Sequence, residues 1–380
     1  MERIRVLHIC DKFGLRGSTI HGVSRLLTWW FPRYDAKRFD VRLYGVKSPD
    51  NASRSMESDG LQIRYMGKSH LGPSMLTAFM RVIQEERPHV LHLHGWIAAN
   101  FGRIAGRMLG VPTLMHEHGV DPSFPGSQRT ADRILSPLTD TAIAVSRSVE
   151  KFLVERRFVD KSKIRLVYNG APLDQFRIAD PTLVANARRE FGIPDGSRVV
   201  GTIGRLDTQK GLIYMLHAIP EIHTAAPDAR FLIVGDGPKR EELEGTARDL
   251  GISEIVTFTG HRSDVATIQS MLDVQAFPSL WEGTPLTVFE AMAMGRAIVS
   301  TDVDGLGEVL VDGRSALIVP PSDSKSLADG ISRVLADEPL RNRLSIGAKE
   351  GSVEFDIQNT VNDLESLYEE LSADAGESRR

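Results

Sequence analysis

The sequence predicts an α/β protein with two Rossmann-like domains, each built on a doubly wound parallel sheet. Its 380 residues exceed what one hydrophobic core normally spans, and about 150 residues per domain predicts two to three domains. Short apolar, β-branched runs alternate with longer amphipathic stretches, which is typical of βαβ units. This alternation occurs twice, on either side of a segment rich in Pro, Asp and Gly at residues 173–197.

The first half of the chain carries the first series of strands and helices. In the predicted helices, apolar residues recur at every third and fourth position, which indicates one buried face. The predicted strands are residues 4–10, 39–44, 90–94, 113–116, 141–145 and 164–168, and the helices include residues 23–30, 75–86 and 98–109.

Residues 173–197 are interpreted as the connection between the domains, because strand signals stop there around one short helix. The predicted N-terminal domain is residues 1–180 and the C-terminal domain is residues 181–355. Residues 356–380 form a last helix, about 357–371, which we expect to pack back on the first domain. The polar tail SADAGESRR after it is predicted to be disordered.

The second half repeats the pattern with short strands that are nearly all apolar, as expected of parallel strands covered on both faces. Pro238 and Asp323 mark the starts of two intervening helices. Two such sheets place the carboxyl ends of their strands on facing edges of a cleft, where ligands bind. The predicted strands are residues 199–203, 231–234, 255–259, 274–277, 297–300 and 316–319.

Composition excludes several classes of protein. With 46 basic and 50 acidic residues the net charge is −4, so no overall positive field holds nucleic acid or an anionic membrane. A single cysteine, Cys10, forms no internal disulfide and is expected in the core. The N-terminus lacks a signal-peptide pattern and no run of 18 apolar residues occurs. We expect a cytoplasmic protein, and peripheral contact with a membrane surface stays open.

The most informative segment is PSLWEGTPLTVFEAMAMG, which begins at Pro278 after an apolar strand. Gly283 and Pro285 mark a loop that turns into a helix. Glu282 therefore lies in the loop, and Glu290 lies about one turn inside the helix.

The first amides of that helix, at Leu286 and Thr287, can receive phosphate oxygens with support from the helix dipole. A carboxylate on each side of a phosphate site suits hydroxyl-rich groups on each side of a diphosphate, which is the layout of a nucleotide sugar. The alternative is that Glu282 is an ordinary loop residue and Glu290 a solvated one. Apolar neighbours of Glu290 favour burial, and a buried carboxylate needs partners.

A second constellation, GTIGRLDTQKG, follows the first strand of the second half. Arg205 offers a planar fork and Lys210 a point charge for a diphosphate. Gly204 and Gly211 allow close backbone approach. The alternative is a charged loop that is only solvated, but its position at a strand end, in the same half as the glutamate pair, favours binding.

Histidines follow two strands of the first half. His116, Glu117 and His118 are metal-ligand types, but side chains adjacent in sequence diverge and no further cluster completes a shell, so no metal site is predicted. His118 is expected to meet a substrate hydroxyl. His116, His92 and His94 are as readily core histidines.

The loop at residues 11–27 carries Gly14, Gly17 and Gly22 ahead of a helix. It lacks G-x-G-x-x-G, which argues against an NAD enzyme. The aromatic cluster at residues 29–31 indicates core or domain-facing packing rather than membrane insertion. In the segment TDVDG, residues 301–305, the D-x-D pattern suits a metal on a diphosphate, but Asp-Gly predicts a turn.

Taken together, these motifs resemble the retaining glycosyltransferases of family four, which have the GT-B fold, over nearly the whole chain. Further blocks at residues 145–176, 231–265 and 307–323 are similar to that family's blocks in the same order. The resemblance implies two Rossmann-like domains that face each other across a cleft. The first domain would hold the acceptor and the second the nucleotide sugar.

The resemblance also implies roles for single residues. Arg205 and Lys210 match the basic pair on the donor diphosphate, Glu290 the carboxylate on the ribose, and Glu282 with the following loop the group on the transferred sugar. The loop from Gly260 to Arg262 frames the base. The implied donor-binding residues are Arg205, Lys210, Gly260, Arg262, Glu282, Gly283, Thr284, Pro285, Leu286, Thr287 and Glu290.

His118 matches the histidine at the sugar and the reacting centre, so the implied catalytic residues are His118, Glu282, Arg205 and Lys210. The acceptor-side loop would include Gly17, His21 and Gly22. This loop departs from the family's paired glycines, because His21 precedes Gly22 and the loop is longer.

Family members of this type need no metal and no cofactor, because the nucleotide sugar is a co-substrate. A UDP-sugar is favoured over a GDP- or ADP-sugar, and the second substrate is a hydroxyl acceptor that no motif identifies. The sugar would leave the diphosphate as the acceptor oxygen arrives on the same face. Two alternatives remain: a sugar-nucleotide epimerase on the same fold, and a catalytically silent subunit that binds sugar nucleotides.

Overall fold

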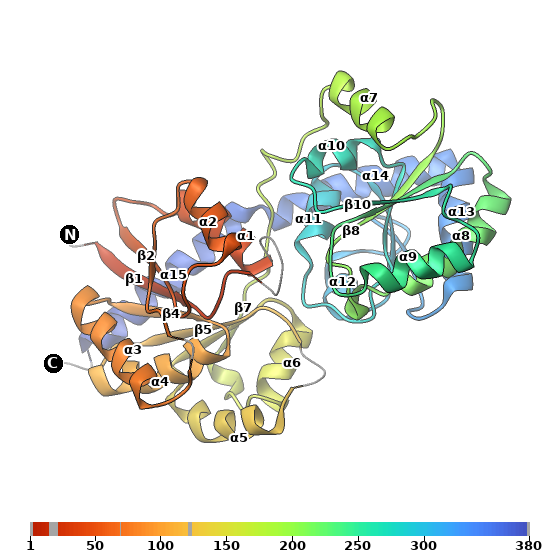
Figure 1. The fold of residues 1–380 in the computed structure, drawn as a ribbon. Helices are drawn as coiled ribbons and strands as arrows, with labels where there is room; N and C mark the ends of the chain where they lie inside the picture. Colours follow the sequence, from red (N-terminus) through yellow and green to blue (C-terminus); the bar gives the residue numbers. More distant parts are fainter. Residues whose placement is uncertain (1–2, 15–21, 69, 121–123, 378–380) are drawn as a thin grey trace. The chain divides into compact units, whose positions relative to one another are not determined.

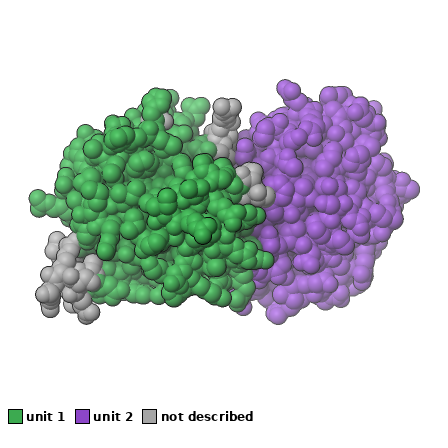
Figure 2. Space-filling model, turned by 90° about the horizontal axis from the view of Figure 1, so that it is seen from below, with its two compact units in different colours: residues 1–169, 357–380 green, residues 170–356 purple. Residues whose placement is uncertain are grey.

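The computed structural model describes residues 3–14, 22–68, 70–120 and 124–377 of the chain. Its elements fall into two compact units, which Figure 2 shows in different colours. Unit 1 comprises residues 1–169 and 357–380, and unit 2 comprises residues 170–356. Both boundaries differ from the expected ones at 180/181 and 355/356.

Unit 1 is built on a seven-stranded sheet with the order β3-β2-β1-β4-β5-β6-β7 (Figure 1). All its strand pairs are parallel. The order reverses between β1 and β4, which is the switch point where open α/β sheets bind ligands. The strands are β1 (Ile4–Cys10), β2 (Phe39–Gly45), β3 (Ile63–Tyr65), β4 (Val90–His94), β5 (Thr113–Glu117), β6 (Thr141–Ala144) and β7 (Ile164–Leu166).

Helices cover both faces of this sheet. Alternation along β1 and β4 points apolar residues such as Leu7 and Leu93 into a core with α3 and α4. The residues between them, including His8 and His92, face the side where α1 and α15 pack. The helices are α1 (Gly22–Trp30), α2 (Asn51–Ser58), α3 (Pro73–Glu86), α4 (Trp96–Leu109), α5 (Gly126–Leu135), α6 (Arg147–Glu155) and α15 (Ile357–Glu377), with short 3-10 turns at Phe31–Arg33, Ser136–Leu138 and Lys161–Lys163.

Helix α15 comes from the far end of the chain and packs against β1, β4 and α1 of unit 1 (Figure 1). Its buried residues include Val361, Leu364 and Tyr368. The helix extends to Glu377, so the expectation of a disordered tail from Ser372 was wrong as far as Glu377. Because this stretch has no proline, it adds turns to an existing helix, which needs no new nucleation.

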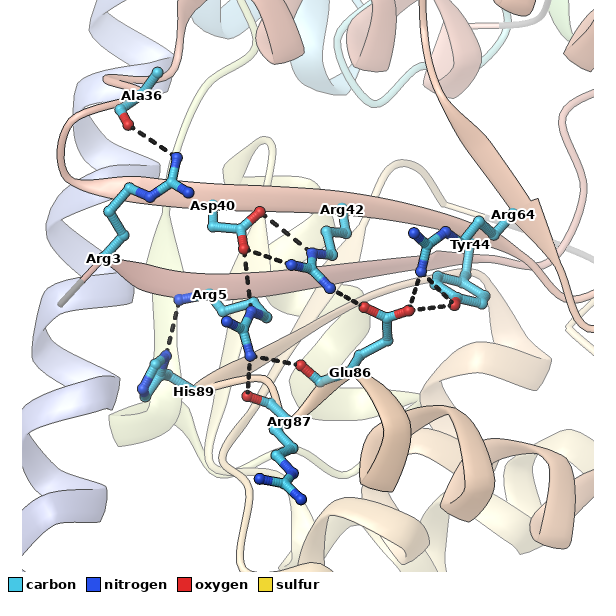
Figure 3. Close-up of polar contacts among 10 residues, drawn as sticks. All are labelled: Arg3, Arg5, Ala36, Asp40, Arg42, Tyr44, Arg64, Glu86, Arg87 and His89. Carbon is cyan, nitrogen blue, oxygen red and sulfur yellow. Dashed lines mark hydrogen bonds and ion pairs between the residues drawn. The ribbon is translucent and has the colours of Figure 1, made fainter.

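A polar network ties β2 to β1 and to the end of α3 (Figure 3). Asp40 pairs with Arg5 at 3.1 Å and with Arg42 at 2.8 Å. Glu86, the last residue of α3, pairs with Arg42 and accepts a hydrogen bond of 2.6 Å from the Tyr44 hydroxyl. This network joins residues that are more than 40 positions apart in the sequence.

Two elements of unit 1 were not predicted, because their sequence patterns are too short or too polar. Strand β3 has three residues, and α2 lies in the polar stretch 47–60. Helix α2 begins with a capping box, in which the Asp50 side chain accepts from the Ser53 amide and the Ser53 hydroxyl accepts from the Asp50 amide.

Unit 2 has a six-stranded sheet with the order β10-β9-β8-β11-β12-β13, again with every pair parallel. The strands are β8 (Val199–Ile203), β9 (Arg230–Val234), β10 (Val256–Gly260), β11 (Val274–Phe277), β12 (Ala297–Thr301) and β13 (Leu317–Val319). The helices are α7 (Pro181–Glu190), α8 (Leu212–Ala225), α9 (Arg240–Asp249), α10 (Val265–Met271), α11 (Leu286–Ala293), α12 (Asp304–Val309), α13 (Ser324–Ala336) and α14 (Glu338–Gly351), with 3-10 turns at Thr208–Lys210 and Ser352–Phe355.

Helix α7 corrects the interpretation of residues 173–197 as a connection between domains. Val184, Ala187 and Phe191 of this segment pack with Ile268 and neighbouring residues in one core of unit 2. The segment is therefore part of unit 2, because Ala187 is buried in this core and Val184 and Phe191 pack against it. Among the described residues, no helix is both long and apolar enough to span a membrane.

Candidate active site

The loops after β8 and β11 lie side by side in unit 2. Val274 of β11 pairs with Val200 of β8, so both strands end at the same edge of the sheet, at the switch point of this sheet's strand order. A pocket between the two loops is lined by Thr202, Ile203, Gly204, Arg205, Leu206, Lys210, Leu212, Val234, Phe277, Pro278 and Ser279.

Glycines allow these loops to touch. Gly211 has a φ of +60°, and a Cβ there would collide with the carbonyl oxygen of Pro278. The amide of Leu280 donates a hydrogen bond of 2.8 Å to the carbonyl of Gln209. Gly235, with a φ of +132°, packs against the Gly204 carbonyl in the same way. The pocket walls are therefore fixed by contacts that a side chain would prevent.

Glu282 is the anchor of the second loop. Its side chain is only 4% exposed, and its Oε1 lies 2.5 Å from Lys210 Nζ. Ser279 Oγ donates to Oε1 at 2.8 Å, and Gln209 Nε2 donates to Oε2 at 3.1 Å. Because both oxygens are engaged, Glu282 orients Lys210 in this structure, and its contact with a transferred sugar stays a prediction.

Arg205 and Lys210 line the same pocket. The Arg205 side chain is 44% exposed, and its Nη1 lies 3.3 Å from Asp207 Oδ2. Lys210 pairs with the buried Glu282, whereas the one ion-pair partner of Arg205 among the described residues is the partly buried Asp207. The structure thus places one planar and one point-like cation beside the ends of β8 and β11.

Helix α11 begins at Leu286, directly after Pro285. Its N-terminus has no side-chain cap and no acidic residue in the first turn, so the amides of Leu286 and Thr287 lack intrahelical acceptors. Glu290 is completely buried within this helix. The alternative that Glu290 is a solvated helix residue was therefore wrong.

The segment TDVDG supports the neighbouring loop. Asp304 begins α12, so the predicted turn is instead the start of a helix, where an aspartate is favourable. Gly305 lies so close to the carbonyl of Gly283 that any Cβ would collide with it. The glycine is required by this packing, and both aspartates, Asp302 and Asp304, are exposed.

Gly260 and Arg262 lie at the end of β10. The Gly260 carbonyl accepts a hydrogen bond of 2.9 Å from Gly235. Arg262 donates to Glu190 of α7 at 2.6 Å and to Asp264 at 2.8 Å, and its guanidinium lies 5.3 Å from the Phe191 ring centre. Arg262 therefore ties α7 to this loop, and the expectation that the loop frames a base stays a prediction.

In unit 1, five histidines converge at the ends of β1, β4 and β5. His8, His92, His94 and His116 are buried, and His118, just after β5, is partly buried. His94 lies 3.0 Å from both His8 and His118, and His92 lies 3.0 Å from His116. The expectation that no further cluster lies with His116 and His118 was wrong, because His94 is close enough to share a ligand with them.

These contacts depend on strand register, which the sequence pattern does not reveal. His8 pairs with His92, and His94 pairs with His116, across parallel neighbours. Of the described residues, two histidine triads have ligand atoms close enough together to share a metal ion, one of His8, His92 and His94 and one of His94, His116 and His118. His8 went unnoticed in the sequence, although alternation along β1 places it on the same face as His92.

The glycine loop after β1 is described in part. Gly17 and His21 lie outside the described residues, and Gly22 is the exposed first residue of α1. The Gly14 amide donates a hydrogen bond of 2.8 Å to Asp50. Asp11, at the start of this loop, accepts from the amides of Ile97 and Ala98 at the N-terminus of α4.

Two family models match the chain. The model described as Glycosyltransferase Family 4 matches residues 20–175, and the model described as Glycosyl transferases group 1 matches residues 184–351.

Among curated relatives, the alpha-D-kanosaminyltransferase of Streptomyces kanamyceticus is 30% identical over 267 residues, which cover 68% of this chain and 67% of the relative. The UDP-Gal:alpha-D-GlcNAc-diphosphoundecaprenol alpha-1,3-galactosyltransferase of Escherichia coli is 27% identical, with 77% of this chain and 78% of the relative covered. HepE of Anabaena, solved with UDP, has a TM-score of 0.83 at 20% identity and covers 97% of this chain and 100% of its own. A further HepE structure contains UDP-glucose.

Proposed function

The chain belongs to glycosyltransferase family 4, and on that premise we propose that it transfers a sugar from a UDP-linked donor to a hydroxyl acceptor with retention of configuration. Its enzyme class is glycosyltransferase, and the predicted fold class of two Rossmann-like parallel-sheet domains is confirmed.

The pocket at the ends of β8 and β11 carries the proposal. Transfer requires a nucleoside diphosphate to leave with growing negative charge, and catalysis consists of stabilising that charge with fixed cations. Arg205 and Lys210 supply a forked and a point charge at one pocket, and Glu282 holds Lys210 in place. We assign these two cations to the diphosphate, with no metal required to neutralise it.

Other residues complete the proposed donor site. The uncapped start of α11, at Leu286 and Thr287, suits a phosphate oxygen, and Glu290 in the same helix is proposed to contact the ribose. Gly260 would lie near the base. In unit 1, His118 is proposed at the transferred sugar, and the loop around Gly22 at the acceptor.

Uridine is favoured by the relatives. The name of the E. coli relative states UDP-Gal as its donor, and HepE is seen with UDP and with UDP-glucose. A thermal-shift panel of UDP, GDP and ADP at equal concentration tests this preference, since a ligand at 100 times its Kd stabilises a protein by about 2.7 kcal/mol. We expect UDP to raise Tm most. A larger shift with GDP or ADP would contradict the proposed donor.

Replacing Arg205 by alanine tests the site. We expect kcat/KM, measured as UDP released from the donor in the presence of acceptor, to fall at least about tenfold, which is about 1.4 kcal/mol of transition-state stabilisation. Arg314→Ala is the control, because Arg314 is an exposed arginine of unit 2 outside the pocket lining. Wild-type kinetics of Arg205→Ala would refute the assignment.

The same assay separates the two alternatives. An epimerase would convert the donor sugar without any acceptor, so product analysis in the absence of acceptor reveals it. A silent subunit would bind UDP and show neither reaction as an isolated chain.

A further inference from the structure

Three lysines lie just after the carboxyl ends of three neighbouring strands of unit 1. Lys12 follows β1, Lys47 follows β2 and Lys68 follows β3, each within three residues of the strand end. These strands are adjacent, in the order β3-β2-β1, and their pairs are parallel. The lysines therefore gather at one edge of the sheet, beside the switch point between β1 and β4, where open α/β sheets bind ligands.

Backbone hydrogen bonds keep the three strand ends together. The Val46 amide donates to the Cys10 carbonyl at 2.9 Å, and the Lys68 amide donates to the Val46 carbonyl at 2.9 Å. Because neighbouring strands are about 4.8 Å apart, the three ends span about 10 Å. The flexible four-carbon stem of a lysine allows three ammonium groups to reach one anion across that span.

The loop after β1 crosses toward β2 and β3. Phe13 in this loop is buried, and its ring contacts that of Tyr65, the last residue of β3, with 6.5 Å between the ring centres. A Cβ at Gly45, the last residue of β2, would collide with the Phe13 ring, so glycine there allows the close approach. The crossing brings Lys12, which precedes Phe13, toward the ends of β2 and β3.

The ammonium groups of these three lysines are unpaired within the described part of the chain. Of the eleven lysine side chains, six form an ion pair or a hydrogen bond with another part of the protein. Three of the other five are at this edge, where Lys12 and Lys47 are exposed and Lys68 is partly exposed. The five lysines with no such partner among the described residues are Lys12, Lys37, Lys47, Lys68 and Lys151.

The carboxylates close to this edge have hydrogen-bond donors of their own. Asp11 accepts from the first amides of α4, and Asp50 accepts from an amide of the loop after β1. Glu57 accepts from a tyrosine hydroxyl at 3.1 Å. Burial raises the pKa of Asp11, whereas the amides and the charges of Lys47 and Lys12 lower it, so both lysines lie within electrostatic range of one carboxylate. The three ammonium groups themselves are available to a ligand.

A phosphate group fits three ammonium groups at one edge. A phosphate monoester carries about 1.5 to 2 negative charges at pH 7 and three terminal oxygens, one for each lysine. Lysine binds phosphate as a point charge, without the fixed orientation that an arginine fork requires. Such a local cluster attracts an anion even though the chain as a whole has a net charge of −4.

We propose that Lys12, Lys47 and Lys68 form a phosphate-binding subsite of unit 1, and that the hydroxyl acceptor carries the phosphate bound there. The second part rests on the proposed function, which places the acceptor in unit 1. Two kinds of acceptor have this chemistry. One is a small sugar or polyol phosphate, and the other is a lipid diphosphate that bears the acceptor sugar.

Calorimetry with inorganic phosphate tests the subsite directly. In the triple variant Lys12→Gln/Lys47→Gln/Lys68→Gln we expect the affinity for phosphate to fall at least about tenfold. Any phosphate bound near Arg205 in unit 2 contributes equally to both proteins, so the difference reports on the three lysines. Raising NaCl from 0.1 M to 1 M should weaken binding to the wild type, because the screening length falls from about 10 Å to about 3 Å.

Lys37→Gln/Lys151→Gln is the matched control, because it removes the two remaining unpaired lysines of the described chain. Neither lies at this edge, since Lys37 precedes β2 and Lys151 lies within α6. We expect the control to keep the wild-type affinity for phosphate. Wild-type affinity in the triple variant would overturn the inference, and so would equal losses in the triple variant and the control.

Glucose 6-phosphate and farnesyl diphosphate distinguish the two kinds of acceptor, with glucose as the uncharged comparison. Tighter binding of glucose 6-phosphate that the triple variant loses supports a small phosphorylated acceptor, and the same result with farnesyl diphosphate supports a lipid-linked one. Glucose that binds as tightly as glucose 6-phosphate would contradict a phosphate subsite. UDP affinity should be equal in all three proteins. A wild type that fails to bind UDP would end the proposed function and leave the phosphate result standing.

Discussion

The buried carboxylate of Glu282 is stabilised by specific hydrogen-bond and ion-pair partners. Glu282 has three side-chain donors, and one of them, Lys210, faces the pocket. A buried carboxylate without such partners is costly, so the same contacts that stabilise Glu282 also fix the position of Lys210. The residue that the sequence marked as a sugar ligand thus has a second role in orienting a cation.

Glu290→Gln keeps the volume of the buried side chain and removes its charge. If the carboxylate contacts the ribose, UDP affinity measured by calorimetry should weaken about tenfold or more, which is about 1.4 kcal/mol. Met292→Leu, a volume-conserving change at a buried position of the same helix, should leave the affinity unchanged. Equal affinity in both variants would refute the ribose contact.

The buried carboxyl group of Asp11 should make the free energy of unfolding depend on pH. Burial raises the pKa of Asp11 to about 6, even though it accepts bonds from the Ile97 and Ala98 amides. Because the folded state then holds this proton more tightly than the unfolded chain, its contribution to stability is present at low pH. It is lost as the pH rises from about 4 to about 6, by an amount on the order of 3 kcal/mol.

In Asp11→Asn this contribution is absent. Urea unfolding at several pH values should therefore show the wild type losing stability relative to the variant between about pH 4 and pH 6. Parallel profiles for the two proteins would show that Asp11 does not titrate in this range.

Some helices and strands of this fold are stabilised mainly by residues that are distant from them in the sequence. Helix α15 belongs to unit 1 through Val361, Leu364 and Tyr368, although all of unit 2 precedes it in the chain. Strand β3, with three residues, is at the edge of the sheet, and β2 is the one strand that pairs with it in the described part of the chain. Such elements have weak local signals, and their stability comes from packing and from polar networks such as the one in Figure 3.

Glu86→Gln tests that network. Burial alone would raise the pKa of Glu86, but the hydrogen bonds from Tyr44 and Arg42 and the charge of Arg64 outweigh it and lower the pKa. Loss of the charge should reduce the free energy of unfolding by about 1–3 kcal/mol in urea titrations at pH 7. The difference from the wild type should shrink as the pH falls through the lowered pKa, because the stabilising carboxylate is then protonated.

Glu85→Gln is the matched control, since the neighbouring Glu85 is exposed and lies 3.8 Å from Arg81 on the same helix. We expect its free energy of unfolding to stay within about 0.5 kcal/mol of the wild type. Equal losses in both variants would show that the network adds nothing beyond general surface charge.

At the scale of the whole molecule, the chain forms two units with separate sheets and separate cores. Each sheet is parallel, has its own switch point and carries polar side chains at the carboxyl ends of its strands. The sequence predicted both sheets because each strand is a short apolar run. It placed the boundary near residue 180, because the short helix there lies among loop-forming residues.

Fragments of unit 2 test the corrected boundary. Residues 170–356 should unfold in one cooperative transition and bind UDP, since the sheet, its cores and the pocket all lie within them. Residues 198–356, which lack α7, should be less stable by several kcal/mol, because loss of the helix exposes a core that includes Ile268. Equal stability of the two fragments would restore residues 173–197 to the role of a linker.

Strands and candidate site residues were predictable where a short apolar run or a short motif marks them. The strands at 4–10, 90–94, 199–203 and 274–277 match the structure to the residue, and Arg205, Lys210 and Glu282 were visible in short motifs. The neighbours of these residues were not predictable. Ser279 and Gln209 lie inside the quoted motifs, but nothing local shows that they donate to Glu282.

The sequence by itself determined the class of the fold, the order of its strands along the chain and the residue types available for chemistry, because hydrophobic periodicity and turn residues act over a few positions. Only the tertiary structure decided that Gly305 packs on Gly283, that Glu282 holds Lys210, and that the Tyr368 hydroxyl contacts His8 and His92. These contacts depend on register between strands and on a helix that returns from the end of the chain. Burial then imposes the requirement that every polar group there find a partner.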